Sequence, residues 1–444
     1  MNRKDIIHIG VRTDGGKSPW YLSISETARR EVRLPYHRSL RVRMGKNCPP
    51  LILPVEPSWQ QARSSGDILV PVRAQKTRHG IVLGPIIAIL TVVRSSTGGF
   101  RGNKANFKDI IKAGKRLGQT VVVCTPEGLR SRERMECFVY TGKGATPWKR
   151  AVLPLPNVVY NRVPDREAER RPEVLRVKKW LAEQQIPLFN NRFFDKAEIH
   201  DWLQGEQETS RYLPYTEALR QEEQIGRMLR RHKLVYVKPA DGKAGDGIIQ
   251  IRAEGKGYAV TVQKKGQRTR TQVSTRQEAA ALAAKAVNNR PYLLQQGISL
   301  ATYDGRQFDL RLLLQKNRHG HWRVTGMGAR IADSDGITTH VPNGGRIEKA
   351  GVALQSAFGK SRAAALEEKV KDMALLIAAA IERQCHSEGQ IGEMSMDIGV
   401  TADGTLYFFE ANAKPMKFDE PYIRAKSLLR LLQYCEFLAE HSVT

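Results

Sequence analysis

Cysteine is scarce in this sequence of 444 residues, and its scarcity excludes two common ways of stabilising a protein. There are five cysteines, an odd number, and no two of them form a Cys-x-x-Cys pair. A disulfide framework and a structural zinc site are therefore both disfavoured. A reducing compartment, the cytoplasm, is the expected location.

Long hydrophobic stretches are also missing. No apolar signal core follows the first residues, and the longest apolar run, residues 81–93, has thirteen residues. A helix that crosses a bilayer needs about 20 residues. We therefore expect no membrane partner, and we expect the run to form a buried strand with its flanks.

Acidic residues are outnumbered. Lys and Arg total 72 against 45 Asp and Glu, which gives a formal net charge of +27. This excess suits a polyanionic partner or an acidic substrate. The basic residues are spread along the whole chain, without a run of five and without an aromatic RNA-binding motif. Nucleic-acid binding is therefore disfavoured as the primary role and is kept as an alternative.

Patterns along the chain predict three domains. Residues 1–80 contain short β-branched alternations, which predict a β-rich domain. Residues 81–190 alternate apolar strands with a helix, which predicts a small doubly wound α/β domain, and a charged helix is expected at 165–184. Residues 191–444 mix strands and helices, with one helix expected to begin at Thr216, an N-cap residue type.

A glycine-rich loop is the most informative local motif. Lys238 begins the pattern Lys-Pro-x-x-Gly-x-x-Gly-x-Gly between two apolar strands. Its glycines, Gly242, Gly245 and Gly247, would let backbone N–H groups approach phosphate oxygens, and the lysine adds a positive charge. The spacing matches neither a P-loop nor a dinucleotide-binding fingerprint. Phosphate binding and a plain hairpin turn both fit the loop alone.

Candidate metal ligands lie near the end of the chain. Glu410 and Asn412 are two residues apart at the end of one predicted strand, so their side chains project the same way. Asp397 lies on the preceding strand, which we predict to pair with theirs through a turn at 403–404. Three oxygen ligands of this kind suit Mg²⁺.

Two arginines precede these ligands on other predicted strands. Arg311 shares one strand face with Asp309, and Arg330 lies on the strand that follows. Each of these charged residues alone would fit an ordinary solvated strand. Their occurrence in this order, after the lysine and glycine loop, favours a nucleotide site.

The ordered motifs resemble the ATP-grasp superfamily, particularly its peptide-ligase branch. The series comprises the loop at 238–247, Phe-Asp-x-Arg at 308–311, Met-Asp-Ile-Gly at 396–399 and Glu-x-Asn at 410–412. Four further segments resemble the YheC/YheD family of endospore coat-associated proteins. They are residues 154–166, 194–196, 213–216 and 295–298. The resemblance covers about residues 84–440.

This resemblance implies an α/β fold with a two-lobed ATP-grasp module after a small α/β domain and a β-rich region. It also implies roles for individual residues. ATP would be bound by Lys196, Lys238, Gly242, Gly245, Gly247, Gln295, Gln296 and Ile298. Arg311 and Arg330 would neutralise the transferring phosphoryl group. Mg²⁺ would be held by Asp397, Glu410 and Asn412.

The implied activity is ADP-forming ligation of an acidic or carboxylate acceptor to an amine donor through an acyl phosphate. Gln295 and Gln296 stand where many ATP-grasp hinges carry Glu, and His340 stands where the peptide-ligase branch often has Asn, with Asn343 as a displaced candidate. The resemblance places the protein in the mother-cell cytoplasm or at the endospore coat. The alternative is a non-catalytic coat or assembly protein that keeps the fold and binds coat proteins.

Overall fold

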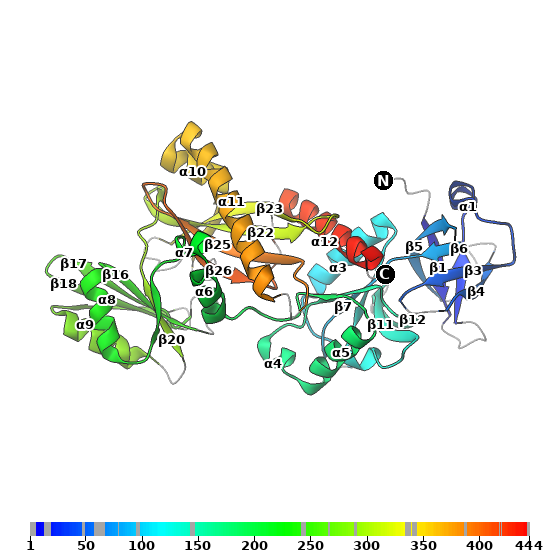
Figure 1. The fold of residues 1–444 in the computed structure, drawn as a ribbon, viewed down its shortest axis with the longest axis horizontal. Coiled ribbons are helices and arrows are strands. Elements are labelled where there is room, and N and C mark those ends of the chain that lie inside the picture. Colours follow the sequence, from blue (N-terminus) through cyan, green and yellow to red (C-terminus); the bar gives the residue numbers. More distant parts are fainter. Residues whose placement is uncertain are drawn as a thin grey trace.

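The computed structural model describes residues 6–12, 19–46, 49–56, 67–78, 80–94, 98–142, 147–240, 246–264, 267–287, 291–333, 339, 344–385, 389–416, 418 and 420–441. Four larger sheets follow one another along an elongated molecule, with the N-terminal sheet at one end and a small lobe at the other (Figure 1). The predicted α/β fold with a β-rich N-terminal region is confirmed. The predicted domain bounds of 1–80, 81–190 and 191–444 stay a prediction.

The N-terminal sheet closes into a six-stranded barrel in the order β1-β2-β4-β3-β6-β5. Along β3, Leu40, Val42 and Met44 are buried and the residues between them are exposed, because alternate side chains of a strand point to opposite faces. The elements are β1 (Ile6–Val11), β2 (Trp20–Ser23), α1 (Glu26–Val32), β3 (Ser39–Met44), β4 (Leu51–Glu56), β5 (Ile68–Thr77) and β6 (Gly80–Leu83).

The second sheet has the strand order β12-β11-β10-β7-β13-β14, in which β10, β7, β13 and β14 run parallel. This sheet forms the predicted α/β domain. Its strands are β7 (Ile86–Leu90), β10 (Thr120–Cys124), β11 (Arg134–Tyr140), β12 (Trp148–Pro154), β13 (Val158–Asn161) and β14 (Leu188–Phe189). The other elements are β8 (Val93–Arg94), β9 (Gly99–Phe100), α3 (Lys104–Leu117), the 3₁₀ turn η2 (Pro126–Gly128), α4 (Arg166–Glu169) and α5 (Pro172–Glu183).

One expectation in this region is confirmed and another is wrong. The apolar run 81–93 contains the expected buried strand, β7, and its N-terminal flank belongs to β6 of the barrel, with Gly84 and Pro85 between the two strands. The charged stretch 165–184 forms two helices, α4 and α5. Pro172 begins the second helix, and a proline disfavours helical backbone in the residue before it.

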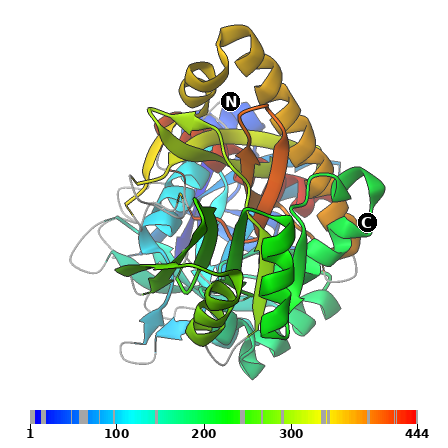
Figure 2. The same cartoon turned by 90° about the vertical axis from the view of Figure 1, so that its left-hand side faces the viewer.

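The small lobe is an antiparallel sheet in the order β15-β20-β16-β17-β18-β19, and Figure 2 shows its helices lying beside the sheet. The helix expected to begin at Thr216 is absent. Thr216–Leu219 instead forms β15, where Thr216 pairs with Gln295, and the helix begins at Glu222. Strand pairing here overrides the local N-cap signal. The elements are β15 (Thr216–Leu219), α8 (Glu222–Arg231), β16 (Leu234–Pro239), β17 (Ile249–Glu254), β18 (Gly257–Lys264), β19 (Gln267–Val273), α9 (Arg276–Ala286) and β20 (Tyr292–Gln296).

The large lobe is an antiparallel sheet in the order β24-β23-β22-β25-β26. Helix α11 packs Met373 and Ile377 against Leu312 and Leu314 on one face. Helix α12 lies on the other face and also packs against α3 of the α/β domain. The elements are α6 (Lys196–Gln204), α7 (Gln207–Ser210), β21 (Thr302–Tyr303), β22 (Arg306–Lys316), β23 (Trp322–Ile331), β24 (Arg346–Lys349), α10 (Ala350–Phe358), α11 (Lys360–Cys385), β25 (Glu393–Val400), β26 (Leu406–Asn412) and α12 (Pro421–His441).

The described helices were also compared with the requirements of a membrane span. In the part of the chain that the structure describes, no helix is both long and apolar enough to cross a membrane.

Candidate active site

The ladder of the large lobe places most of the predicted polar residues on one face of the sheet. Arg311 of β22 lies opposite Asp397 of β25, and Asp397 lies opposite Glu410 of β26. Directly opposite residues project to the same face of a sheet, and so do residues two apart on one strand. Asn412 therefore joins this face. The predicted pairing of the two strands is confirmed.

Asp397, Glu410 and Asn412 form a compact polar group on this face. Asn412 Nδ2 donates a hydrogen bond to Glu410 Oε1 (3.1 Å). Asp397 is 2% exposed, and its Oδ1 atom accepts no hydrogen bond from any residue that the structure describes. Burial raises the pKa of Asp397 to about 6, against the opposite effect of Arg330 and Arg311.

This group fits a hard cation. A buried carboxylate oxygen without a donor is rare, and a metal ion would satisfy it. Within the described ranges, no group of three or more His, Cys, Asp and Glu side chains is arranged to hold a metal. Mg²⁺ would accordingly take two carboxylates and one amide from the protein, and water and phosphate oxygens would complete its coordination.

The two predicted arginines differ in how they are held. Arg330 donates to both oxygens of Asp309 (2.9 and 2.7 Å) and lies 2.8 Å from Asp397 Oδ2. Burial alone would lower the pKa of Arg330, but Asp397 and Asp309 raise it above its ordinary value. Arg311 is held loosely, 3.8 Å from Asp397 Oδ1 and 3.5 Å from Ser395 Oγ. Its side chain is about a quarter exposed, so Arg311 can reach a ligand.

Lys196 connects the start of α6 to the same group. The helix begins there because Asp195 caps it, with Oδ1 accepting from the backbone N–H groups of Ala197 and Glu198. Lys196 Nζ lies 3.0 Å from Glu410 Oε2. The predicted first lysine of the nucleotide site therefore contacts a predicted metal ligand.

Lys238 lies near the end of β16 in the small lobe and faces the large lobe. Its Nζ donates to Gln295 Oε1 (2.6 Å) and lies 5.8 Å from the centre of the Phe409 ring. Gln295 is fixed in turn, because its Nε2 donates to Thr216 Oγ1 (3.0 Å). Burial, then Lys196, lowers the pKa of Lys238 to about 8.

The remaining predicted nucleotide contacts are only partly described. Gln296 Oε1 accepts from the Tyr215 backbone N–H (3.2 Å), and Ile298 is buried. Gly247 has φ +77, a left-handed backbone that favours glycine. Gly242, Gly245, His340 and Asn343 lie outside the described residues.

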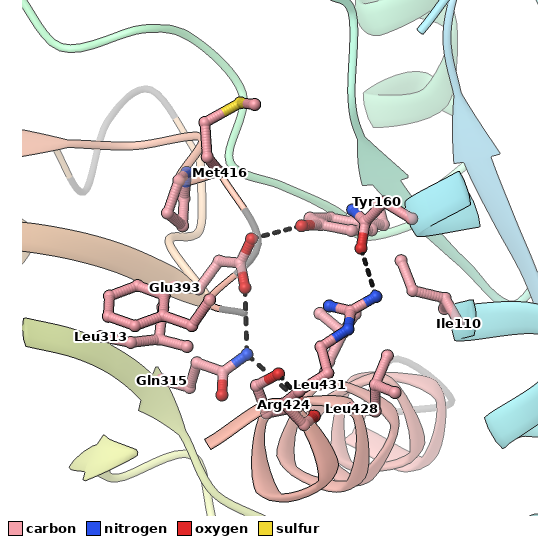
Figure 3. Close-up of a pocket in the computed structure, with 13 residues that line it drawn as sticks. Ile110, Tyr160, Leu313, Gln315, Glu393, Met416, Arg424, Leu428 and Leu431 are labelled. Atoms are coloured by element: carbon pink, nitrogen blue, oxygen red, sulfur yellow. Dashed lines mark hydrogen bonds between the residues drawn. The ribbon is translucent and has the colours of Figure 1, made fainter. Parts of the chain in front are cut away.

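A cleft continues this face of the sheet toward the α/β domain (Figure 3). Leu313 and Gln315 of β22 follow Arg311 at two-residue steps, and Gln315 lies opposite Glu393. Four residues of strand place Glu393 about 13 Å from Asp397. Figure 3 shows Tyr160 and Gln315 reaching Glu393 from opposite sides, and Gln315 Nε2 donates to it (3.0 Å).

Cationic side chains also border the cleft. Arg424 of α12 donates to Asn106 Oδ1 (2.6 Å) and Asp109 Oδ2 (3.0 Å) on α3. Arg162 lies 3.5 Å from Glu393 Oε1. Sequence analysis missed these residues as site residues. Arg162 belongs to segment 154–166, which carries part of the family resemblance. That segment is the sequence feature from which Arg162 could have been predicted.

Comparisons with known proteins identify the family of this chain. The model of the YheC/D like ATP-grasp family matches residues 185–438. The endospore coat-associated protein YheD of Bacillus subtilis (strain 168) is 30% identical over 86% of this chain and 83% of its own length. YheC of the same organism is 24% identical over 67% of this chain and 78% of its own length.

A solved structure with a similar fold is D-alanyl-alanine synthetase A from Vibrio cholerae O1 biovar eltor. It is 13% identical, with a TM-score of 0.44, over 81% of this chain and 97% of that chain. The family match spans more than half of this sequence and includes every predicted site residue. This chain belongs to the YheC/D-like ATP-grasp family.

Proposed function

We propose that this protein is an ATP- and Mg²⁺-dependent ligase that joins a carboxylate to an amine. The observation that carries the proposal is that two lysines lie beside the group Asp397, Glu410 and Asn412. Lys196 Nζ is 3.0 Å from Glu410, and Lys238 of the small lobe is 5.8 Å from the ring of Phe409, the neighbour of Glu410. Cations that face a cluster of metal-type ligands suit a polyphosphate bridged to a metal ion.

The chain's own residues would bind and orient the reactants. Lys196 and Lys238 would contact phosphate oxygens of ATP, and Asp397, Glu410 and Asn412 would hold Mg²⁺, which neutralises phosphate charge when bound. An acceptor carboxylate oxygen attacks the γ-phosphorus, and the bond to the ADP oxygen breaks. An amine nitrogen then attacks the acyl carbon, phosphate leaves, and the nitrogen loses a proton to give the amide.

The two arginines would have different roles in this reaction. Arg311 has few bonds within the protein and would contact the transferring phosphoryl group. Arg330 is already bonded to Asp309 and Asp397, so it would hold these carboxylates in place. Stabilisation of charge by groups fixed in advance is a large part of catalysis in such sites.

The acceptor would occupy the cleft beyond Arg311. The cleft shares its sheet face with the proposed metal ligands. Arg424 lines it, and Arg311 lies two residues before the lining residue Leu313 on β22. With the net charge of +27, this supports an acceptor that carries an acidic group. The names of the two Bacillus subtilis relatives support a place at the endospore coat, and synthesis in the mother-cell cytoplasm stays a prediction.

The test is nucleotide turnover with a chemical trap for the acyl phosphate. Mg-ATP, hydroxylamine and pools of acidic peptides should give ADP together with a hydroxamate. The Glu410→Gln variant should give neither, and omission of the peptide should stop the wild type as well. ADP release that is independent of any carboxylate would contradict the ligase proposal.

A second candidate is a non-catalytic coat protein that keeps the fold. The observation in its favour is that both relatives are named for association with the endospore coat and not for a reaction. Saturable Mg-ATP binding without turnover in any peptide pool would favour this candidate.

A further inference from the structure

The segment that follows the proposed metal ligands is tied to the α/β domain at three consecutive residues. Asn190 Nδ2 donates to the carbonyl oxygen of Ala413. Lys414 forms an ion pair with Glu169, and Arg162 Nη2 donates to the carbonyl oxygen of Pro415 (3.1 Å). These partners come from the residue after β13, from α4 and from the segment after β14, far from β26 in the sequence.

Lys414 is the buried ammonium group among these attachments, with a side chain that is 3% exposed. Its Nζ also donates to the carbonyl oxygen of Val163 (3.2 Å) and lies 4.5 Å from the centre of the Phe193 ring. Glu169 accepts from Asn161 Nδ2 (2.9 Å) and pairs with Lys178 as well. A buried ammonium group is stable only when it is paired and hydrogen-bonded in this way.

This attachment lies just beyond the point where β26 stops pairing with β25. The pair Ser395 and Asn412 is the last one of the β25 and β26 ladder. Beyond this pair, the direction of the backbone depends on the contacts that residues 413–415 make with the α/β domain. Asn190 also accepts from the N–H groups of Gly392 and Glu393 (2.9 and 3.3 Å), so the α/β domain holds the adjoining ends of both ligand-bearing strands.

We propose that Lys414 is a positioning residue, which fixes Asn412 and Glu410 in the geometry that Mg²⁺ requires by anchoring the end of β26 to Glu169. The inference rests on the proposed function, because that proposal assigns Mg²⁺ to these side chains. Groups that orient metal ligands typically change metal affinity by about 10–100-fold when removed.

Lys178 offers a matched control. It pairs with the same Glu169 and donates to the carbonyl oxygen of Asn191 (2.6 Å), but it lies on α5, and among the described residues no hydrogen bond or ion pair joins it to β26. Lys414→Met should raise the Mg²⁺ concentration for half-maximal binding of an ATP analogue by about tenfold or more. Metal-free affinity for the analogue should stay unchanged. Lys178→Met should stay within about twofold of the wild type, and Lys414→Arg should recover much of the loss.

A second measurement does not depend on the metal. Hydrogen exchange at residues 410–415 of the nucleotide-free protein should become faster in Lys414→Met and not in Lys178→Met. If Lys414→Met does not fold, Glu169→Gln should show the same changes in a weaker form.

The outcomes separate the two proposals. Wild-type exchange at 410–415 and a wild-type Mg²⁺ requirement in Lys414→Met would overturn the positioning role. A wild-type protein that binds nucleotide without any effect of Mg²⁺ would instead overturn the metal site, while hydrogen exchange would still decide whether Lys414 holds the strand end.

Discussion

Arg311 and Arg330 show how equal charges on neighbouring strands acquire different roles. Arg330 has its guanidinium bonded to Asp309 and Asp397, and all three side chains are buried. Arg311 has long contacts with Asp397 and Ser395, its guanidinium lies 5.9 Å from the centre of the Phe418 ring, and its side chain remains partly exposed. The number of N–H groups already used within the protein therefore supports the different roles that we propose for the two arginines.

Substitution should separate these roles. Arg330→Met would remove the guanidinium that bonds to the buried carboxylates of Asp309 and Asp397, which should cost about 3–5 kcal/mol of stability. Arg311→Met should change the free energy of unfolding by less than about 1 kcal/mol, because Arg311 is partly exposed and lies as far as 3.8 Å from Asp397, while turnover falls strongly. Urea unfolding and ADP release measure the two effects. Equal stability losses in both variants would contradict the distinction.

The lowered pKa of Lys238 predicts that nucleotide affinity depends on pH. Burial and the neighbouring Lys196 lower its pKa to about 8 from 10.5, so it is charged at neutral pH and loses its proton as pH rises through about 8. Nucleotide affinity should therefore fall above pH 8. Titrations of ATP from pH 6.5 to 9.5 should show this fall in the wild type and not in Lys238→Met.

The stability effect of Lys238 has the opposite sign. The unfolded chain binds this proton more tightly than the folded protein between pH 8 and 10.5. The charged Lys238 therefore lowers the free energy of unfolding in full below about pH 8, and stability should rise as pH increases toward 10.5.

The binding prediction has its own contrary outcome. Nucleotide affinity that stays constant across pH 8 would place Lys238 away from the phosphates.

At the scale of elements, a bulge in β26 joins the two lobes. Asp397 pairs with Glu410 and Ile398 with Phe408, so Phe409 is the extra residue between them. The Phe409 ring covers Gly399 of β25 and lies near Lys238 of the small lobe. The irregularity therefore presents an aromatic ring to the nucleotide side of the sheet.

Gly399→Ala tests this arrangement. A Cβ atom at this position would lie 2.4 Å from the Phe409 ring, so the ring must move. Overpacking of this kind costs about 1–3 kcal/mol, and the displaced ring should also weaken nucleotide binding. The double variant Gly399→Ala with Phe409→Leu should recover stability in urea unfolding. A fully stable Gly399→Ala protein with wild-type affinity would show that the ring has room to move.

For the whole molecule, the sequence predicted what depends on short-range spacing. The shared face of Glu410 and Asn412, and the pairing of their strand with that of Asp397, follow from a period of two and a short turn. The contact between Tyr160 and Glu393 joins residues 233 positions apart, which no local pattern encodes. Thr216 shows the converse case, since its local helix signal lost to pairing with Gln295.

The two-lobed arrangement gives a last prediction, which concerns the binding of Mg-ATP by both lobes together. Lys238 belongs to the small lobe and Glu410 to the large one, so Mg-ATP held by both should stabilise them together. A ligand at a hundredfold excess over its Kd adds about 2.7 kcal/mol to the folded state. Lys238→Met and Glu410→Gln should each lose most of the rise in Tm with Mg-ATP.

Hydrogen exchange gives the local counterpart of this measurement. Exchange across residues 242–247 should slow on addition of Mg-ATP in the wild type and not in Glu410→Gln, although the substitution lies in the opposite lobe. EDTA should remove the slowing in the wild type, because the carboxylates would then repel the phosphates instead of sharing a cation with them. A full rise in Tm and full slowing in Glu410→Gln would mean that the nucleotide binds to the small lobe alone. The large-lobe carboxylates would then not form its metal site.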